Sequence, residues 1–111
     1  MPTPKIDELL LLMDRAFADS EHSLLKNLAS VRDESWSQIP QGGKRSIQNI
    51  VAHVGMFKFM YANHGFGAGD LDYGDPPASP EPERLASVEA AMDYLRQGHE
   101  YLTGCIRELG N

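Results

Sequence analysis

The side chains best suited to bind a metal in this chain are its four histidines, His22, His53, His64 and His99. A catalytic zinc-type site needs three protein ligands and an open fourth position. His53 and His64 share a predicted helix face, but about 16 Å of helix axis separates them, which is too far for one metal ion. We expect His22 to face solvent, on the side of its helix opposite the apolar residues. His53 and His99 remain as the pair able to converge, and two histidines do not complete a site.

Each of these two histidines also has a purely structural interpretation. His99 lies within an apolar helical seam, which favours a buried histidine hydrogen-bonded to a carboxylate or to backbone. His53 lies at the edge of its helix's apolar stripe, where a half-buried structural residue and a metal ligand are equally well supported. We keep His53 and His99 as candidate metal ligands.

Other chemistry finds little support in the sequence. Cys105 has no histidine within one helical turn and is expected to be an inert, buried thiol. As the single cysteine, it also excludes an intramolecular disulfide. The loop aspartates Asp70, Asp72 and Asp75 do not continue into the pattern of a calcium-binding EF-hand. Ser46 is explained as a helix cap, so no nucleophile stands out.

Three stretches have the apolar spacing of amphipathic helices, at about 5–28, 46–64 and 87–109. The predicted stripes are, in chain order, Ile6, Leu10, Met13, Phe17, Leu24 and Leu28; Ile47, Ile50, Val54, Phe57 and Tyr61; and Val88, Met92, Leu95, His99, Leu102, Ile106 and Leu109. These stripes require mutual burial, which predicts an all-α, up-and-down helical bundle in a single domain, 1–111.

Helix boundaries and connections can also be predicted. Ser46 with Asn49, and separately Ser87, are expected to cap the second and third helices. In the first connection we expect Trp36 and Ile39 to fold back onto the bundle. The second connection, 65–85, is rich in Gly, Pro and Asp and is long for a compact domain.

Composition limits the partners and the compartment. The chain has 111 residues and a net charge of −6, from 10 Lys and Arg against 16 Asp and Glu. With no basic block to neutralise phosphates, we expect no nucleic-acid partner. No apolar stretch approaches the ~20 residues that span a bilayer, and no secretory signal is evident, so we expect a cytoplasmic protein without a membrane partner.

The stretch from Trp36 to Val54 resembles the DinB/YfiT-like superfamily. The matching residues are Pro40, Gly42, Gly43, Ser46, Ile47, Ile50, Val51 and His53. The resemblance implies a four-helix bundle, often a homodimer, that binds a divalent metal such as nickel or zinc through three histidines. His53 occupies the position of the ligand on the second helix. The other two ligands of the family form a His-x-x-x-His pair on a fourth helix.

This sequence departs from that pattern, because it contains no His-x-x-x-His and has Lys44 where an aromatic residue is common. We therefore expect either a fragment or a short relative that completes its bundle with a partner, as a homodimer. Two functions stay open. One is a metal-dependent hydrolase or thiol transferase of unknown substrate, with His53 as one ligand. The other is a non-catalytic, homodimeric helical binding or scaffold domain without a metal.

Overall fold

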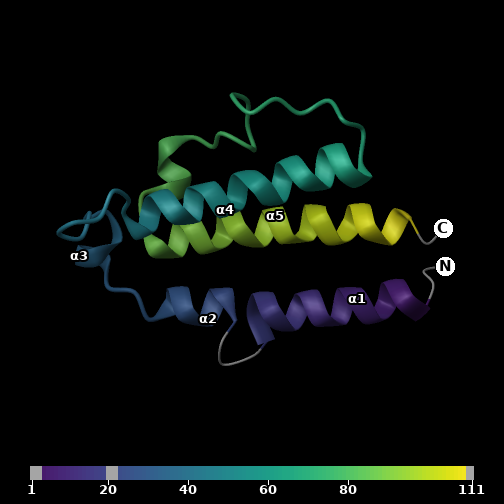
Figure 1. Ribbon diagram of the computed structural model, residues 1–111, viewed down its shortest axis with the longest axis horizontal. Helices are drawn as coiled ribbons and strands as arrows, with labels where there is room; N and C mark the ends of the chain where they lie inside the picture. The colour runs from purple at the N-terminus through teal and green to yellow at the C-terminus, as the bar shows by residue number, and fades with distance from the viewer. Residues whose placement is uncertain (1–3, 20–22, 110–111) are drawn as a thin grey trace.

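The computed structural model describes residues 4–19 and 23–109, and over these residues it consists of helices joined by turns and loops, without strands (Figure 1). Its elements are the α-helices α1 (Pro4–Asp14), α2 (Leu24–Ala29), α3 (Asp33–Trp36), α4 (Ile47–Tyr61) and α5 (Val88–Glu108), the π-helical turns η1 (Arg15–Asp19) and η2 (Ala62–Phe66), and the 3-10 turn η3 (Pro82–Leu85). The predicted all-α fold is confirmed. His22, expected to face solvent, lies outside the described residues.

Helix α5 lies in the middle of the fold, with α4 on one side and α1 and α2 on the other (Figure 1). The starts of α4 and α5 meet at Leu85, whose carbonyl oxygen accepts from Gln48 Nε2 at 2.8 Å. Their far ends also meet, because Asn63 Nδ2 donates to the Tyr101 hydroxyl at 3.0 Å. The two helices therefore run in the same direction. The long second connection makes this possible by returning the chain along α4, which departs from the alternating directions of a simple up-and-down order.

The first predicted helix is divided into two. Ser23 has an extended backbone (φ −70°, ψ 158°), and its hydroxyl oxygen accepts from the Lys26 N–H, which starts α2. A serine hydroxyl competes for backbone donors in this way, so it favours a helix start over a helix interior. A single helix over 5–28 is therefore wrong, although its stripe is largely retained. The buried members of that stripe are Leu10, Phe17 and Leu28.

The first connection follows the prediction at one apolar residue and not at the other. Trp36 is buried in the main core, and its indole Nε1 donates to the Leu85 carbonyl at 2.9 Å. Ile39 is 57% exposed, so its expected return to the bundle is wrong. The chain turns directly after Ile39, where the Gly43 N–H donates to the Pro40 carbonyl.

Helix α4 begins as predicted but packs through a different face. Ser46 and Asn49 form a reciprocal capping box. The buried residues of α4 are Val51, Gly55, Phe59 and Met60. Ile50 is 50% exposed and Tyr61 is 64% exposed, so the predicted stripe is wrong at these two positions. Because α4 is apolar around most of its surface, residue spacing alone does not fix which face is packed.

Two glycines allow α4 and α5 to lie close together. A Cβ atom added at Gly55 would lie 2.2 Å from Tyr94 Cε2. A Cβ atom added at Gly98 would lie 3.2 Å from Phe59 Cε2 and 3.3 Å from Lys58 Cβ. The missing side chains thus place Lys58, on α4, directly against α5.

The long second connection is fastened to the bundle by buried polar groups. Tyr94 is fully buried, and its hydroxyl donates to the Pro77 carbonyl at 2.7 Å. Burial raises the pKa of Tyr94 to about 12, against a smaller lowering by the Arg84 guanidinium. Near the start of the loop, the Leu71 N–H donates to Asn63 Oδ1 at 2.9 Å. The loop therefore covers one side of α4 and α5 as an ordered layer.

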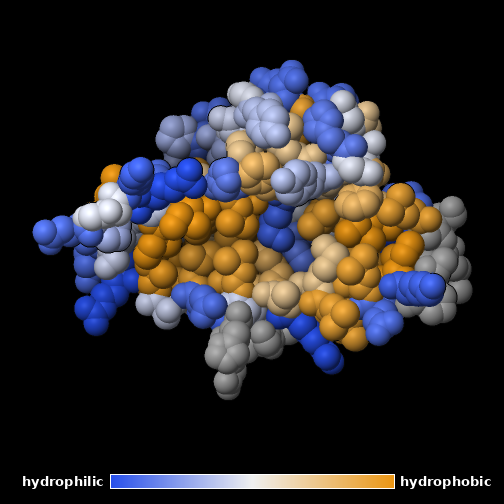
Figure 2. Space-filling model, viewed as in Figure 1, coloured by the Kyte–Doolittle hydropathy of each residue, from blue (hydrophilic) through white to orange (hydrophobic). Residues whose placement is uncertain are grey.

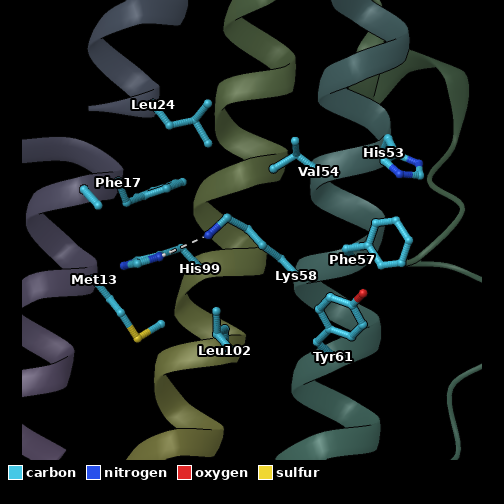
Figure 3. A pocket seen from close by; sticks show the side chains of 11 residues that line it. Met13, Phe17, Leu24, His53, Val54, Phe57, Lys58, Tyr61, His99 and Leu102 are labelled. Atoms are coloured by element: carbon cyan, nitrogen blue, oxygen red, sulfur yellow. Dashed lines mark hydrogen bonds between the residues drawn. The ribbon is translucent and has the colours of Figure 1, made fainter. Parts of the chain in front are cut away.

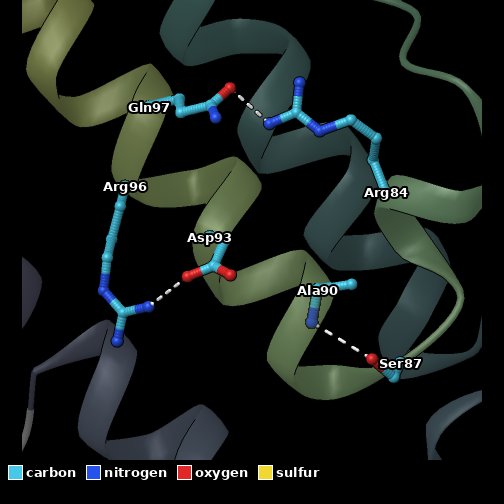
Figure 4. A network of polar contacts seen from close by, with 6 residues as sticks. All are labelled: Arg84, Ser87, Ala90, Asp93, Arg96 and Gln97. Atoms are coloured by element: carbon cyan, nitrogen blue, oxygen red, sulfur yellow. Dashed lines mark hydrogen bonds and ion pairs between the residues drawn. The ribbon is translucent and has the colours of Figure 1, made fainter.

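Helix α5 begins at the predicted cap. The Ser87 hydroxyl accepts from the Ala90 N–H at 3.1 Å (Figure 4). Further along α5, Gln97 accepts a hydrogen bond from Arg84 in η3. Capping of this kind stabilises a helix by about 1 kcal/mol. Among the described residues, none of the helices has the length and apolar character needed to cross a bilayer.

The close packing of α4 on α5 predicts a sharp effect for Gly55→Ala. The new methyl group overlaps the Tyr94 ring, so we expect a loss of about 1–3 kcal/mol in the free energy of unfolding, measured by urea denaturation. Gly104→Ala is the matched control, since a Cβ atom there meets nothing within 4 Å. The control should gain about 0.5–1 kcal/mol from helix propensity. Equal effects of the two substitutions would contradict this account.

Candidate functional site: an apolar pocket with a lysine in its wall

A groove runs along the face between α1 and α4, with α5 as its floor. Figure 2 shows two hydrophobic areas on this face, separated by a hydrophilic strip near the middle. Within the groove lies a pocket of about 530 Å³, a volume suited to a small organic ligand. The pocket is lined by Met13, Ala16, Phe17, Leu24, His53, Val54, Phe57, Lys58, Tyr61, His99 and Leu102.

The polar part of the pocket is a chain of three side chains from three helices. Lys58 on α4 points across the pocket, and its Nζ lies 3.4 Å from His99 Nδ1 on α5 (Figure 3). His99 Nε2 lies 2.6 Å from Asp14 Oδ1 at the end of α1. The Phe17 ring stacks on the His99 ring, with centroids 4.1 Å apart and planes 5° apart. Phe17 also lies beneath Lys58, whose Nζ is 4.6 Å from the ring centroid.

These contacts determine which ring nitrogen of His99 carries the proton when the imidazole is neutral. The ammonium group of Lys58 only donates, so Nδ1 accepts. The ring proton then lies on Nε2, which donates to Asp14 Oδ1. The carboxylate holds the ring in place and leaves the basic nitrogen directed at Lys58.

Lys58 is a half-buried cation that has no anionic partner among the described residues. In the described parts of the chain, the ion pairs are Arg96 with Asp93 and His99 with Asp14, and neither involves Lys58. Desolvation by burial lowers the pKa of Lys58 below its usual value of 10.5. The groups that face it are a phenyl ring, an imidazole and the apolar pocket, and none of these replaces a counterion.

The two predicted metal ligands both line this pocket but do not come together. His99 is buried, with both ring nitrogens in contact with Asp14 and Lys58. His53 is exposed, and its ring packs edge-on against Phe57 with centroids 4.4 Å apart. Figure 3 shows His53 on the opposite side of the pocket from His99.

Within the described part of the chain, these two positions do not by themselves complete a divalent-metal site. Among the described residues, no group of three His, Cys, Asp or Glu side chains is placed to hold one. The nitrogen of His99 that faces the pocket is already opposite the Lys58 ammonium, which repels a second cation. His53 and His99 as metal ligands stay a prediction that other residues would have to complete.

The contacts of His99 agree with its structural interpretation as a buried seam histidine, because its ring is hydrogen-bonded to the Asp14 carboxylate. Sequence reasoning missed Lys58 and Asp14. A signal for Lys58 was present, because it is the one charged residue in the apolar run Gly55–Met60, where a cation is expensive to bury. No comparable signal exists for Asp14, whose contact with His99 joins positions 85 residues apart.

The fold and the pocket define an all-α helical-bundle protein with a small-molecule-sized cavity between its helices. The family model of the DinB superfamily matches residues 16–111. The chain therefore belongs to the DinB superfamily. No curated protein and no solved structure matches it significantly.

The half-buried charge of Lys58 predicts how the stability of the fold depends on pH. A lysine with a lowered pKa in the folded state binds its proton more weakly there than in the unfolded chain. Its charge therefore destabilises the fold at neutral pH, and this penalty fades as pH rises from the lowered pKa to 10.5. We expect Lys58→Met to raise the Tm at pH 7 and to lose that advantage by pH 10.5, measured by circular dichroism.

Lys44→Met is the control for this effect, because Lys44 is exposed in the first connection. It should leave the Tm nearly unchanged at both pH values. A lower Tm for Lys58→Met at pH 7 would show that the lysine stabilises the empty pocket.

Proposed function

We propose that this DinB-superfamily chain is a binding protein for a small apolar molecule with an anionic group, held in the pocket between α1 and α4. The observation that carries the proposal is Lys58, a half-buried cation that borders an apolar pocket and has no carboxylate partner among the described residues. A ligand anion would supply the missing charge, and its apolar part would cover the surrounding walls. Ligand sites commonly combine apolar walls with a few polar groups in this way.

The walls of the pocket support an elongated apolar ligand. Phe17 and Met13 approach from the α1 side, Val54 and Phe57 from α4, and Leu102 from α5 (Figure 3). Burial of apolar surface stabilises a complex by roughly 25 cal/mol per Å² before the costs of association are subtracted. Medium-chain carboxylates match both the apolar walls and the single cation.

Decanoate and decanol provide a test that separates the charge from the chain. Isothermal titration calorimetry should show one decanoate bound per chain. Loss of a charge-assisted hydrogen bond costs about 1.5–3 kcal/mol, so Lys58→Met should weaken decanoate roughly 10- to 100-fold. Decanol should bind the variant and the parent protein alike. The affinity for decanoate should also fall as pH rises through the lowered pKa of Lys58.

Two results would contradict the proposal. One is decanoate binding that Lys58→Met does not weaken. The other is a groove occupied by a second copy of the chain, as in the homodimer expected from the sequence, shown in sedimentation experiments by a dimer that decanoate neither enters nor dissociates. The exposed leucines of α1, Leu9, Leu11 and Leu12, make that measurement necessary.

Metal-dependent chemistry is the other function expected from the family resemblance. It requires ligands beyond His53 and His99, which the described residues do not bring together. Titration with zinc or nickel is the direct check, and we expect no stoichiometric binding that His53→Ala abolishes. Stoichiometric binding lost in that variant would restore the metal-dependent function.

A further inference from the structure

We propose that Lys58 reacts as a nucleophilic amine, forming an imine with an apolar aldehyde in the pocket while His99 accepts the proton of the ammonium group. The inference rests on the proposed binding of an apolar molecule at this site and names its reactive chemistry. It follows from the order Asp14–His99–Lys58, in which the basic ring nitrogen is directed at the lysine amine.

The first requirement is a free amine. A lysine ammonium has no lone pair, so the amine reacts only after losing a proton. His99 Nδ1 lies 3.4 Å from Lys58 Nζ, within reach of that proton after a small approach of the two groups. Asp14, 2.6 Å from the other ring nitrogen, stabilises the imidazolium ion that results.

The second requirement is space in front of the amine for the aldehyde and its apolar chain. Lys58 and His99 both line the pocket, whose other walls are mainly apolar. An anion-binding site by itself does not need a base behind its cation, and arginine serves that role more directly.

The atoms and charges of the reaction balance. The Lys58 ammonium gives one proton to His99, and the amine lone pair attacks the aldehyde carbon while the carbonyl π electrons move to oxygen. The resulting carbinolamine takes up a proton from the imidazolium and loses its oxygen as water. The nitrogen lone pair completes a protonated C=N bond. In sum, an ammonium ion and an aldehyde give an iminium ion and one water, without oxidation or reduction.

Reductive trapping tests this inference. The protein is incubated with decanal and sodium cyanoborohydride at pH 7, and the modified lysines are found by peptide mass spectrometry. We expect a decyl group on Lys58 at least about tenfold faster than on the exposed Lys44, and slower trapping after His99→Gln. Lys58→Arg should abolish the fast adduct while Lys44→Arg leaves it intact. Circular dichroism establishes that each variant is folded.

The results separate this inference from the proposed binding function. Fast trapping at Lys58 that decanoate blocks supports both. Decanoate binding with no preference of decanal for Lys58 overturns the imine inference and leaves binding in place. Fast trapping without decanoate binding keeps the reactive lysine but removes the anion site. Uniform slow labelling of all lysines, with no decanoate binding, overturns both.

Discussion

The close approach of α4 and α5 is the constraint on which the rest of the structure depends. Gly55 admits the Tyr94 ring, and Gly98 admits the base of Lys58. Because Gly98 immediately precedes His99, the same contact that packs the helices also places Lys58 beside the imidazole. Tyr94 in turn holds the long connection through the Pro77 carbonyl. The fold and the candidate site are thus set by one helix interface.

The polar centre of the groove is stabilised unevenly. His99 is well supported, stacked on Phe17 and bonded to Asp14. From the described residues, Lys58 receives a long contact to an imidazole and a position over an aromatic ring, and the ring contact is worth about 0.5–2 kcal/mol. A cation in that setting gains from any anion that enters the pocket. Its deprotonated form gains from the same burial, so anion binding and amine reactivity are two consequences of one environment.

The sequence predicted the helices better than it predicted their packed faces. In α5 the apolar seam is regular, and its members Val88, Leu95 and Ile106 are buried as expected. In α4 nearly every face is apolar, and the contact with α5 is made through Gly55. A glycine has no apolar side chain, so the spacing of apolar residues does not identify it as a packing position. The break at Ser23 depends on a cap that competes with a continuous helix by a small energy. Asp14, His99 and Lys58 meet through tertiary contacts between three helices, which residue spacing cannot predict.

The central claim is that Lys58 is a half-buried cation that an anion in the pocket would stabilise. NMR titration of the lysine ε-methylene groups tests this claim most directly. The chain has four lysines, so Lys58→Met assigns the Lys58 signal at once. The account predicts a titration midpoint below 10.5 for Lys58 in the free protein, and an upward shift of that midpoint when decanoate is added. A midpoint at or above 10.5 that decanoate leaves unchanged would contradict it.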